Sequence, residues 1–334
     1  RPSGGSSKRT TMTRYVLRRL IQAVPLLLVI SMIVFLLMQL IPGGPTSVYE
    51  NDPNKTAEDL ARLRAEFGLD VPIPQRYANW LGSALHGDFG TSLVTKRPVM
   101  AEIGDRLPNT LQLSLLAFAC SLLLAIPIGA ISAARQYSRF DAVFTTLAFF
   151  GQSIPLFWLG LLLIIFFNVT LKQASGAPLL PGGGMSTIGA DFDLGDRLRH
   201  LILPTLALTF FNMGTHVRYM RSGMLDVMHQ DFVRTARAKG LGEFMALAKH
   251  ALRNAILPLI TIIGLELPGL FNGALITETI FSWPGMGRLF FTSIERSDYG
   301  VMMGILMMSA TLIIVFGLLT DVMYAVLNPR IRFD

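Results

Sequence analysis

Three carboxylates fall inside long apolar stretches of this sequence. Glu266 lies in LELPG, Glu278 in ITETIF and Asp321 in LLTDVMYAVL. A carboxylate at the centre of a bilayer costs several kcal/mol unless it faces protein or water. Pro268 and Gly269 follow Glu266, and a broken helix is tolerated at membrane depth where it lines a cavity or packs on protein. We therefore take Glu266, Pro268 and Gly269 as candidates for a solute pathway, with helix pairing as an equal alternative. Glu278 and Asp321 are expected to be structural.

Signatures of catalysis are weak in this chain. A phosphate-binding loop requires Gly-Lys followed by Ser or Thr, and no lysine here follows a glycine. The nearest candidate for an intramembrane nucleophile is Ser153 in GQSIP, which lacks a recognisable base. His86, His229 and His250 show no metal-ligand spacing. We predict no catalytic, cofactor-binding or metal-binding residue. His216 is interpreted as lying near a cytoplasmic helix end, with a ligand or proton-carrier role as the alternative.

Composition indicates the class of protein whose elements must position these residues. The 334 residues are 51% hydrophobic and 15% charged, with a net charge of +7 and a mean hydropathy of +0.50. A soluble domain is closer to a quarter charged. The sequence therefore predicts an all-α polytopic membrane protein. Its positive charge is assigned to cytoplasmic loops, because no aromatic-plus-basic pattern of a nucleic-acid reader accompanies it.

Six stretches reach the roughly 20 apolar residues that a membrane helix needs. They are residues 15–41, 107–134, 143–171, 200–220, 256–281 and 303–327. Pro108, Pro204 and Pro258 are expected in the first turns of their helices, where proline removes no hydrogen bond. Residues 1–11 form an expected flexible leader or expression remnant, and 12–41 the first membrane helix. Residues 42–106 form an outer segment with helices at Thr56–Phe67 and Ile73–Leu85, and 107–334 a five-helix core.

Basic residues in the short loops predict the orientation, because cytoplasmic loops are rich in Lys and Arg. Such residues precede the first span, separate the second from the third, separate the fourth from the fifth, and follow the sixth. All of these segments fall on one side of six spans. Both termini and the loop 221–255 are therefore expected in the cytoplasm.

The loop 221–255 contains a short amphipathic pattern that ends at a glycine. On a helix, Phe232, Ala236 and Lys239 share one side with Thr235, while Arg234 and Arg237 share another. Gly240 would end the helix. The pattern favours docking into a partner protein over lying on anionic lipid. The candidate coupling residues are Asp231, Phe232, Arg234, Thr235, Ala236, Arg237, Lys239 and Gly240.

The run RTARAKGL followed by HALRNAILP resembles the EAA-type loop of permease subunits of bacterial ABC importers. Arg234 and Thr235 stand where that pattern has Glu and Ala, and the spacer before Pro258 is longer, as is typical of the dipeptide/oligopeptide/nickel branch. RYVLRRLIQAVPLLLVIS, HGDFGTSL, ETIFSWPGMGRL and DVMYAVLNPRIRF are similar to the first permease of dipeptide transporters, so the resemblance covers nearly the whole chain.

The resemblance implies a type I ABC importer permease in the bacterial inner membrane. It further implies a second homologous permease, two ABC ATPase subunits and an extracytoplasmic substrate-binding protein as partners. ATP and Mg would then be bound by the ATPase subunits, while this chain binds no cofactor. Dipeptides or oligopeptides are the expected cargo, with nickel, glutathione or a sugar-like solute as alternatives on the same scaffold. A membrane enzyme or lipid-surface scaffold is the alternative from another class.

Overall fold

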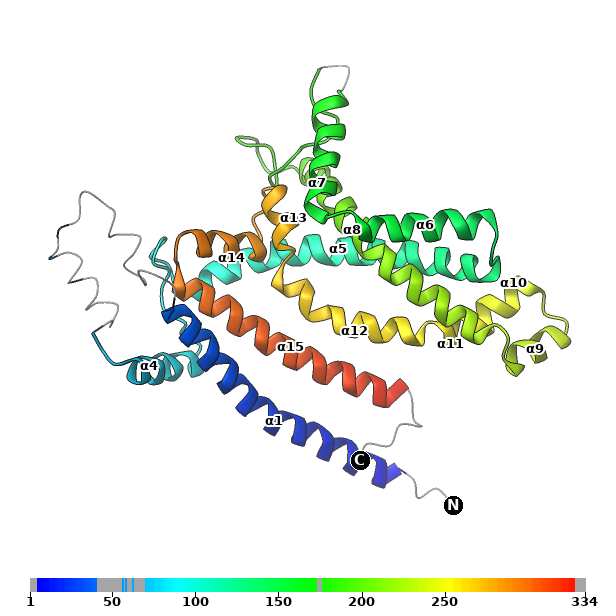
Figure 1. Cartoon of the computed structure of the whole chain (residues 1–334), viewed down its shortest axis with the longest axis horizontal. Coiled ribbons are helices and arrows are strands. Elements are labelled where there is room, and N and C mark those ends of the chain that lie inside the picture. The colour runs from blue at the N-terminus through cyan, green and yellow to red at the C-terminus, as the bar shows by residue number, and fades with distance from the viewer. Residues whose placement is uncertain are drawn as a thin grey trace. The chain divides into compact units, whose positions relative to one another are not determined.

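The computed structural model describes residues 5–40, 56, 58, 62, 70–172 and 176–327, with side chains described between residues 17 and 321. Most of the predicted helix Thr56–Phe67 lies outside these residues, and so do residues 1–4 of the predicted leader; residues 5–11 belong to the first helix. Extended pairing in the described part of the chain is limited to two isolated bridges, Thr91 with Pro98 and Lys172 with Pro178. The described chain is therefore built from helices (Figure 1).

The chain forms two compact units, residues 1–108 with 285–334 and residues 109–284. The first unit contains α1 (Gly5–Gln39), α4 (Ile73–Leu85), α14 (Met286–Glu295), α15 (Tyr299–Leu327) and the start of α5 (Val99–Ala134). The second contains the rest of α5 and α6 (Arg139–Ser153), α7 (Leu156–Ile164), η2 (Ile165–Thr170), α8 (Leu194–Val227), α9 (Asp231–Ala238), α10 (Glu243–Ala246), η3 (Leu247–Ala251), α11 (Leu252–Ala255), α12 (Leu257–Asn272) and α13 (Leu275–Ile280). This grouping differs from the predicted 107–334 core, because α15 packs on α1.

The first unit is held together by apolar contacts between α1 and α15. Phe35 and Met38 of α1 form a buried cluster with Met302 and Met303 of α15. The predicted helix Ile73–Leu85 is confirmed as α4. Its Tyr77 hydroxyl lies 2.8 Å from the Ser31 Oγ of α1, which fastens the amphipathic α4 to the first membrane helix.

In the second unit, α8 contacts α6, α7, α11, α12 and α13. Glycines allow its closest approaches. A Cβ atom on Gly214 would lie 2.5 Å from the Ala148 carbonyl oxygen of α6, and one on Gly223 would lie 2.3 Å from that of Ala255 in α11. Close backbone approach through small residues is the usual basis of helix packing in membranes, where lipid removes the hydrophobic drive. Helix α8 therefore has little freedom to move independently of its neighbours.

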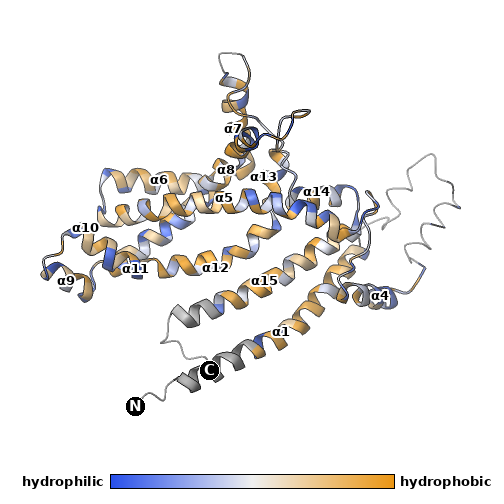
Figure 2. Cartoon of the chain, turned by 180° about the vertical axis from the view of Figure 1, so that it is seen from behind, coloured by the Kyte–Doolittle hydropathy of each residue, from blue (hydrophilic) through white to orange (hydrophobic). Residues whose placement is uncertain are grey.

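Four described helical segments are long and apolar enough to cross a membrane: Leu17–Gln39, Val99–Ala134, Leu257–Ile280 and Tyr299–Asp321. Figure 2 shows hydrophobic residues along most of α12 and of the coloured parts of α1 and α15, as expected for helices surrounded by lipid. The predicted third span is two helices, α6 and α7 with η2, bent by 101° at Ser153–Pro155, and counts as a fifth span only if the pair is taken together. Pro155 explains the break, because proline disfavours helical backbone in the residue before it.

Helix α8 contains the predicted fourth span, 200–220, but does not join this apolar group. It has 34 residues, and polar residues such as His200, Asn212 and His216 lower its hydropathy. The six-span prediction is thus compatible with the fold but only partly matched by hydropathy. The expectation that Pro108 and Pro204 lie in first turns is wrong, because α5 begins at Val99 and α8 at Leu194. For Pro258, at the start of α12, it is confirmed.

Candidate functional site

The predicted amphipathic helix is present as α9, Asp231–Ala238. Asp231 lies in its first turn and Arg237 in its last, the arrangement that the helix dipole favours. Lys239 is its C-cap, and Gly240 follows with φ of +88°, a left-handed backbone conformation that glycine adopts without strain. The prediction that Gly240 ends the helix is confirmed.

The faces of α9 differ from the sequence prediction. Val233 and Ala236 are buried, whereas Phe232 is 37% exposed and Arg234 and Thr235 are exposed. Ala236 and Phe232, which the sequence analysis placed on one side of the helix, therefore differ in burial. Val233 explains the difference, because an apolar side chain one residue beyond Phe232 turns the buried stripe toward positions 233 and 236. Ala236 packs within the chain itself.

The buried side of α9 belongs to an apolar core at the C-terminal end of α8. Val233 clusters there with Met220, Met224 and Val227 of α8, and the same cluster includes Leu247 of η3. Ala251 and Ala255 join it from the next two helical turns. We call residues 231–255 the coupling segment. It is attached to α8 by continuous apolar packing, so a displacement of α9 must also move the end of α8.

The outer side of the coupling segment exposes large apolar side chains beside charges. Phe244 is 82% exposed and Met245 49% exposed, both on α10 directly after α9. Arg237 of α9 pairs with Glu243 at 2.6 Å, which fixes α10 relative to α9. Exposed apolar residues with a charged rim mark a protein or membrane interaction surface. The coupling segment therefore presents such a surface while its inner side is packed on α8.

A polar cluster links three helices of the same unit. The His216 ring of α8 is fully buried; its Nδ1 lies 2.7 Å from the Ser121 Oγ of α5, and its Nε2 lies 2.8 Å from the Glu266 Oε2 of α12. Phe118 packs edge-on against the ring, with centroids 5.6 Å apart. We call Ser121, His216 and Glu266 the polar cluster. A neutral imidazole with its proton on Nε2 satisfies both contacts, accepting from Ser121 and donating to Glu266.

Glu266 also borders a cleft of about 310 Å³ in this unit, with a side chain 35% exposed. Ser114 and Asn212 add polar groups to the lining, and Gly269 lies there without a side chain. Pro268 is buried and does not border the cleft. The helix continues through Pro268 and breaks only after Asn272, at Gly273 with φ of +82°. Of the three predicted pathway residues, the structure therefore brings Glu266 and Gly269 to one cleft.

The two carboxylates predicted to be structural both have protein partners. Glu278 of α13 is fully buried and accepts a hydrogen bond from the Thr110 Oγ1 of α5 at 2.8 Å. Asp321 of α15 pairs with Arg19 of α1 at 3.1 Å. Each carboxylate thus links two helices within its own unit. Their structural role stays a prediction that these contacts favour.

The interpretation of His216 as a residue near a cytoplasmic helix end is wrong. It lies 11 positions before the end of α8 at Val227 and has no exposed surface. The sequence did contain a signal, since a histidine and a glutamate in apolar surroundings each need a partner. Ser121 was missed altogether, because a lone serine in an apolar helix ordinarily bonds to its own backbone.

Helical spans, a cleft bordered by a carboxylate and an exposed apolar surface beside charges are consistent with an integral membrane protein of the transport class. Residues 125–333 match the model of the binding-protein-dependent transport system inner membrane component, and residues 12–114 match the model of its N-terminal part. The chain belongs to this family of transport permeases, and its fold is that of a type I ABC importer permease.

Two curated relatives align over almost their whole length. The chain is 43% identical to the oligopeptide transport system permease protein AppB of Bacillus subtilis strain 168, over 96% of this chain and 100% of the relative. It is 38% identical to the dipeptide transport system permease protein DppB of Escherichia coli K12, over 96% of this chain and 99% of the relative. The resemblance to the dipeptide/oligopeptide branch is therefore confirmed.

Proposed function

We propose that this chain is half of the membrane pathway of an ATP-driven peptide importer, and that its coupling segment is the surface on which an ATPase subunit acts. The observation that carries this proposal is the two-sided construction of residues 231–255. Phe232, Phe244 and the charged Asp231 and Arg234 are exposed, while Val233 and Ala236 are packed inward. An ATPase subunit bound to the exposed side would therefore displace the coupling segment together with the end of α8, because the inner side of the segment is packed on that helix.

Helix α8 provides the route by which such a push reaches the cleft. Gly223, at the contact with α11, and His216, in the polar cluster, are separated by seven residues, about 10 Å along a helix. His216 in turn contacts α5 through Ser121 and α12 through Glu266. Movement of the coupling segment would therefore shift the three helices together, as alternating access between outward- and inward-facing states requires.

The proposed assembly contains this chain, a second homologous permease, two ABC ATPase subunits and an extracytoplasmic binding protein. ATP and Mg are bound by the ATPase subunits, because this sequence has no phosphate-binding loop. The excess of Arg and Lys in the loop 221–255 supports a cytoplasmic coupling segment and two cytoplasmic termini. The outer segment with α4 then faces the binding protein.

Dipeptides or short oligopeptides are the proposed cargo, because the names of the relatives describe peptide and dipeptide transport. Within the pathway, Glu266 would offer a carboxylate to the cargo, held in place by His216. Replacing Glu266 with Gln keeps the shape of the side chain and removes its charge. We expect uptake of cationic peptides to fall more than that of neutral ones; equal uptake of both would remove Glu266 from cargo contact.

The alternative of a membrane enzyme finds no support in the polar cluster. Ser121, His216 and Glu266 contain the residue types of a hydrolase triad, but the Ser121 side chain is fully buried and does not border the cleft. A nucleophile must reach its substrate. The other serine considered, Ser153, hydrogen-bonds the Phe149 carbonyl oxygen of its own helix.

Reconstitution tests the proposed function. The chain would be co-expressed with its second permease and two ATPases, placed in proteoliposomes and supplied with the binding protein. We expect ATP-dependent accumulation of a dipeptide, and no comparable accumulation of nickel or glutathione. Accumulation of nickel or glutathione in place of the dipeptide would overturn the cargo assignment. Accumulation that continues without ATP would overturn the ATP-driven mechanism.

A further inference from the structure

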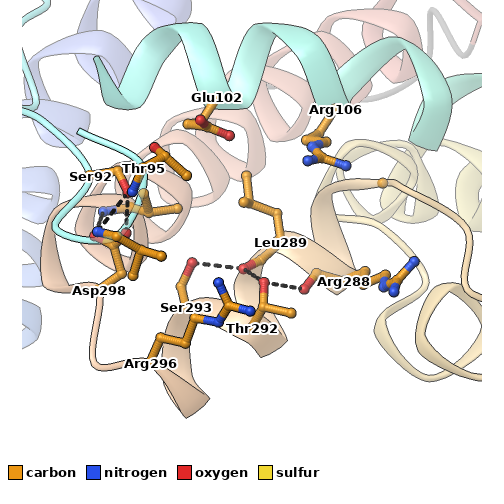
Figure 3. A pocket seen from close by; sticks show the side chains of 13 residues that line it. Ser92, Thr95, Glu102, Arg106, Arg288, Leu289, Thr292, Ser293, Arg296 and Asp298 are labelled. Carbon is orange, nitrogen blue, oxygen red and sulfur yellow. Dashed lines mark hydrogen bonds between the residues drawn. The ribbon is translucent and has the colours of Figure 1, made fainter. Parts of the chain in front are cut away.

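A second cavity lies wholly within the first unit and is unrelated to the coupling segment. It measures about 290 Å³ and is bordered by α5, α14 and the loop that precedes α5. Three arginines line it: Arg106 on α5, Arg288 on α14, and Arg296, the C-cap of α14. Figure 3 shows Arg106 projecting from α5 toward α14 and Arg296 projecting from the end of α14 toward α5. The cavity is therefore a concave site with more arginines than carboxylates in its lining.

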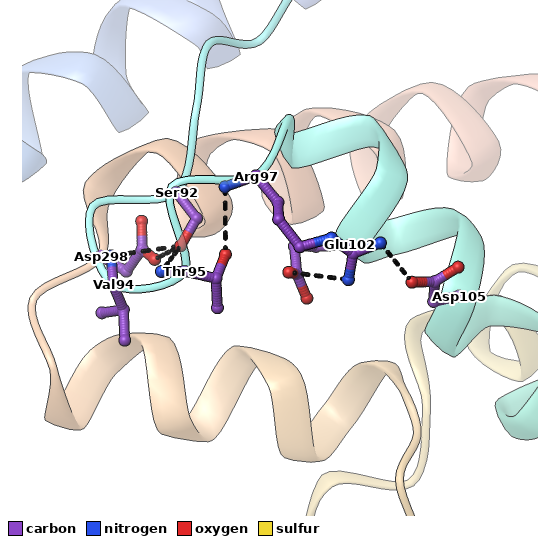
Figure 4. A network of polar contacts seen from close by, with 7 residues as sticks. All are labelled: Ser92, Val94, Thr95, Arg97, Glu102, Asp105 and Asp298. Carbon is purple, nitrogen blue, oxygen red and sulfur yellow. Dashed lines mark hydrogen bonds and ion pairs between the residues drawn. The ribbon is translucent and has the colours of Figure 1, made fainter.

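The two carboxylates of this cavity already have partners (Figure 4). Glu102 is buried and pairs with Arg97 at 3.2 Å. Asp298 is buried, accepts a hydrogen bond from the Ser92 Oγ and accepts another from the Leu93 backbone N–H at 3.1 Å. These contacts fasten the loop 91–98 to its unit. Both carboxylates thus stabilise the wall of the cavity through contacts within the chain.

Two of the three arginines, Arg106 and Arg296, are not used in that way. Within the part of the chain that the structure describes, neither Arg106 nor Arg296 forms an ion pair with a carboxylate. The hydroxyl-bearing residues Thr95 and Thr292 also border the space. Guanidinium groups pair with carboxylates through short, charge-assisted hydrogen bonds that are often bidentate. The cavity therefore has the chemistry to receive a carboxylate from outside the chain.

We propose that this arginine cavity binds the free C-terminal carboxylate of a peptide cargo. The inference rests on the proposed function, since the cargo must be a peptide and the loop 91–98 must face outward. A cavity of this size accommodates a carboxylate with its adjoining residue, and a free C-terminal carboxylate is the group common to peptides of every sequence. The site would thus select for a free C-terminus independently of side chains.

The test measures peptide binding to the purified permease–ATPase complex without its binding protein. Calorimetric titrations would compare alanyl-alanine with its C-terminal amide, for the native complex and for the double variant R106Q/R296Q. We expect the native complex to prefer the free carboxylate by about 10-fold or more, and the double variant to lose this preference. The single variant R296Q changes only an exposed side chain at the end of α14 and should lose part of it.

Arg135→Gln is the matched control, since it removes the same charge from an exposed residue between α5 and α6 that does not line the cavity. It should keep the native preference. Native complex without a preference, or variants that retain it, would overturn the inference. A variant that no longer associates with the binding protein but keeps its preference for the free carboxylate would also overturn the inference. The cavity would then be a docking site for the binding protein. Failure of the native transporter to import alanyl-alanine would instead contradict the proposed function.

Discussion

The coupling segment packs on α8, and the polar cluster includes His216 of α8 itself. The coupling segment exposes its polar groups, whereas the polar cluster buries its imidazole. In the coupling segment the charges of Arg234 and Lys239 face outward, and small apolar residues face α8. In the polar cluster the imidazole of His216 is fully buried, with Phe118 packed against the ring and its nitrogens bonded to Ser121 and Glu266. The exposed groups of the coupling segment can therefore contact a partner protein, whereas the hydrogen bonds of the polar cluster join helices of the same chain.

This difference predicts two separable kinds of variant. Changes in the polar cluster should lower the stability of the protein, because they leave a buried or half-buried polar group without its partner. Changes on the outer side of the coupling segment should lower stability by less than about 1 kcal/mol and affect assembly. A large loss of stability together with a loss of assembly would break the comparison.

The largest loss of stability is expected for His216→Ala. The substitution empties a fully buried imidazole site and removes the partner of Glu266, at a combined cost of about 2–4 kcal/mol. Unfolding in mixed micelles would measure the change in the free energy of unfolding. The double variant H216A/E266Q should cost less than the sum of its single variants. Strict additivity would mean that the two side chains do not interact.

A loss of about 1–3 kcal/mol is expected for Gly223→Ala, because its new Cβ would lie 2.3 Å from the Ala255 carbonyl oxygen. The same measurement on Gly317→Ala is the matched control. Gly317 lies in α15 with no atom within 4 Å of an added Cβ, and alanine is the better helix former. Equal stability of the two variants would contradict the close packing of α8 on α11.

Ser121→Ala should have a smaller effect, about 0.5–1.5 kcal/mol, since it removes a single neutral hydrogen bond to His216. Ser309→Ala serves as its control, because among the described residues Ser309 bonds the Ile305 carbonyl oxygen of its own helix. Thermal unfolding of the two variants would show the difference. A larger loss for the Ser309 variant would remove Ser121 from the cluster.

The smallest loss of stability is expected for Glu243→Gln, which breaks the ion pair with Arg237. Both side chains are partly exposed, so the pair is worth less than about 1 kcal/mol. Yet α10 would no longer be fixed relative to α9, and we expect weaker recovery of the ATPase subunits on co-purification. Unchanged recovery would show that the orientation of α10 is unimportant.

Local signals in the sequence predicted much of this fold. Hydropathy located the first, second, fifth and sixth spans, and the periodicity of Tyr77 and Trp80 located α4. Gly240 predicted the end of α9, because the left-handed backbone conformation that favours glycine depends only on neighbouring residues. Pro155 likewise indicates the bend between α6 and α7. We did not predict that bend, because a search for long apolar runs does not detect a single proline.

Features that depend on distant contacts could not be predicted in this way. His216 is 95 residues from Ser121 and 50 from Glu266, so their meeting follows from the packing of α8 and from no pattern along the chain. The inward face of α9 could not be predicted for the same reason, because the apolar core that Val233 joins is built mainly by α8, η3 and α11. The arginine cavity joins residues 106 and 296, which only the fold brings together.

The central claim, that the outer side of the coupling segment engages the motor, is tested most directly by Phe244→Asp. The side chain is 82% exposed, so the substitution should leave the unfolding temperature unchanged. Phe192→Asp is the control, since Phe192 is 79% exposed in the loop before α8. We predict that the ATPase subunits co-purify with the Phe192 variant but not with the Phe244 variant, which would import no dipeptide. A Phe244 variant that retains its ATPase subunits and native uptake would contradict the account.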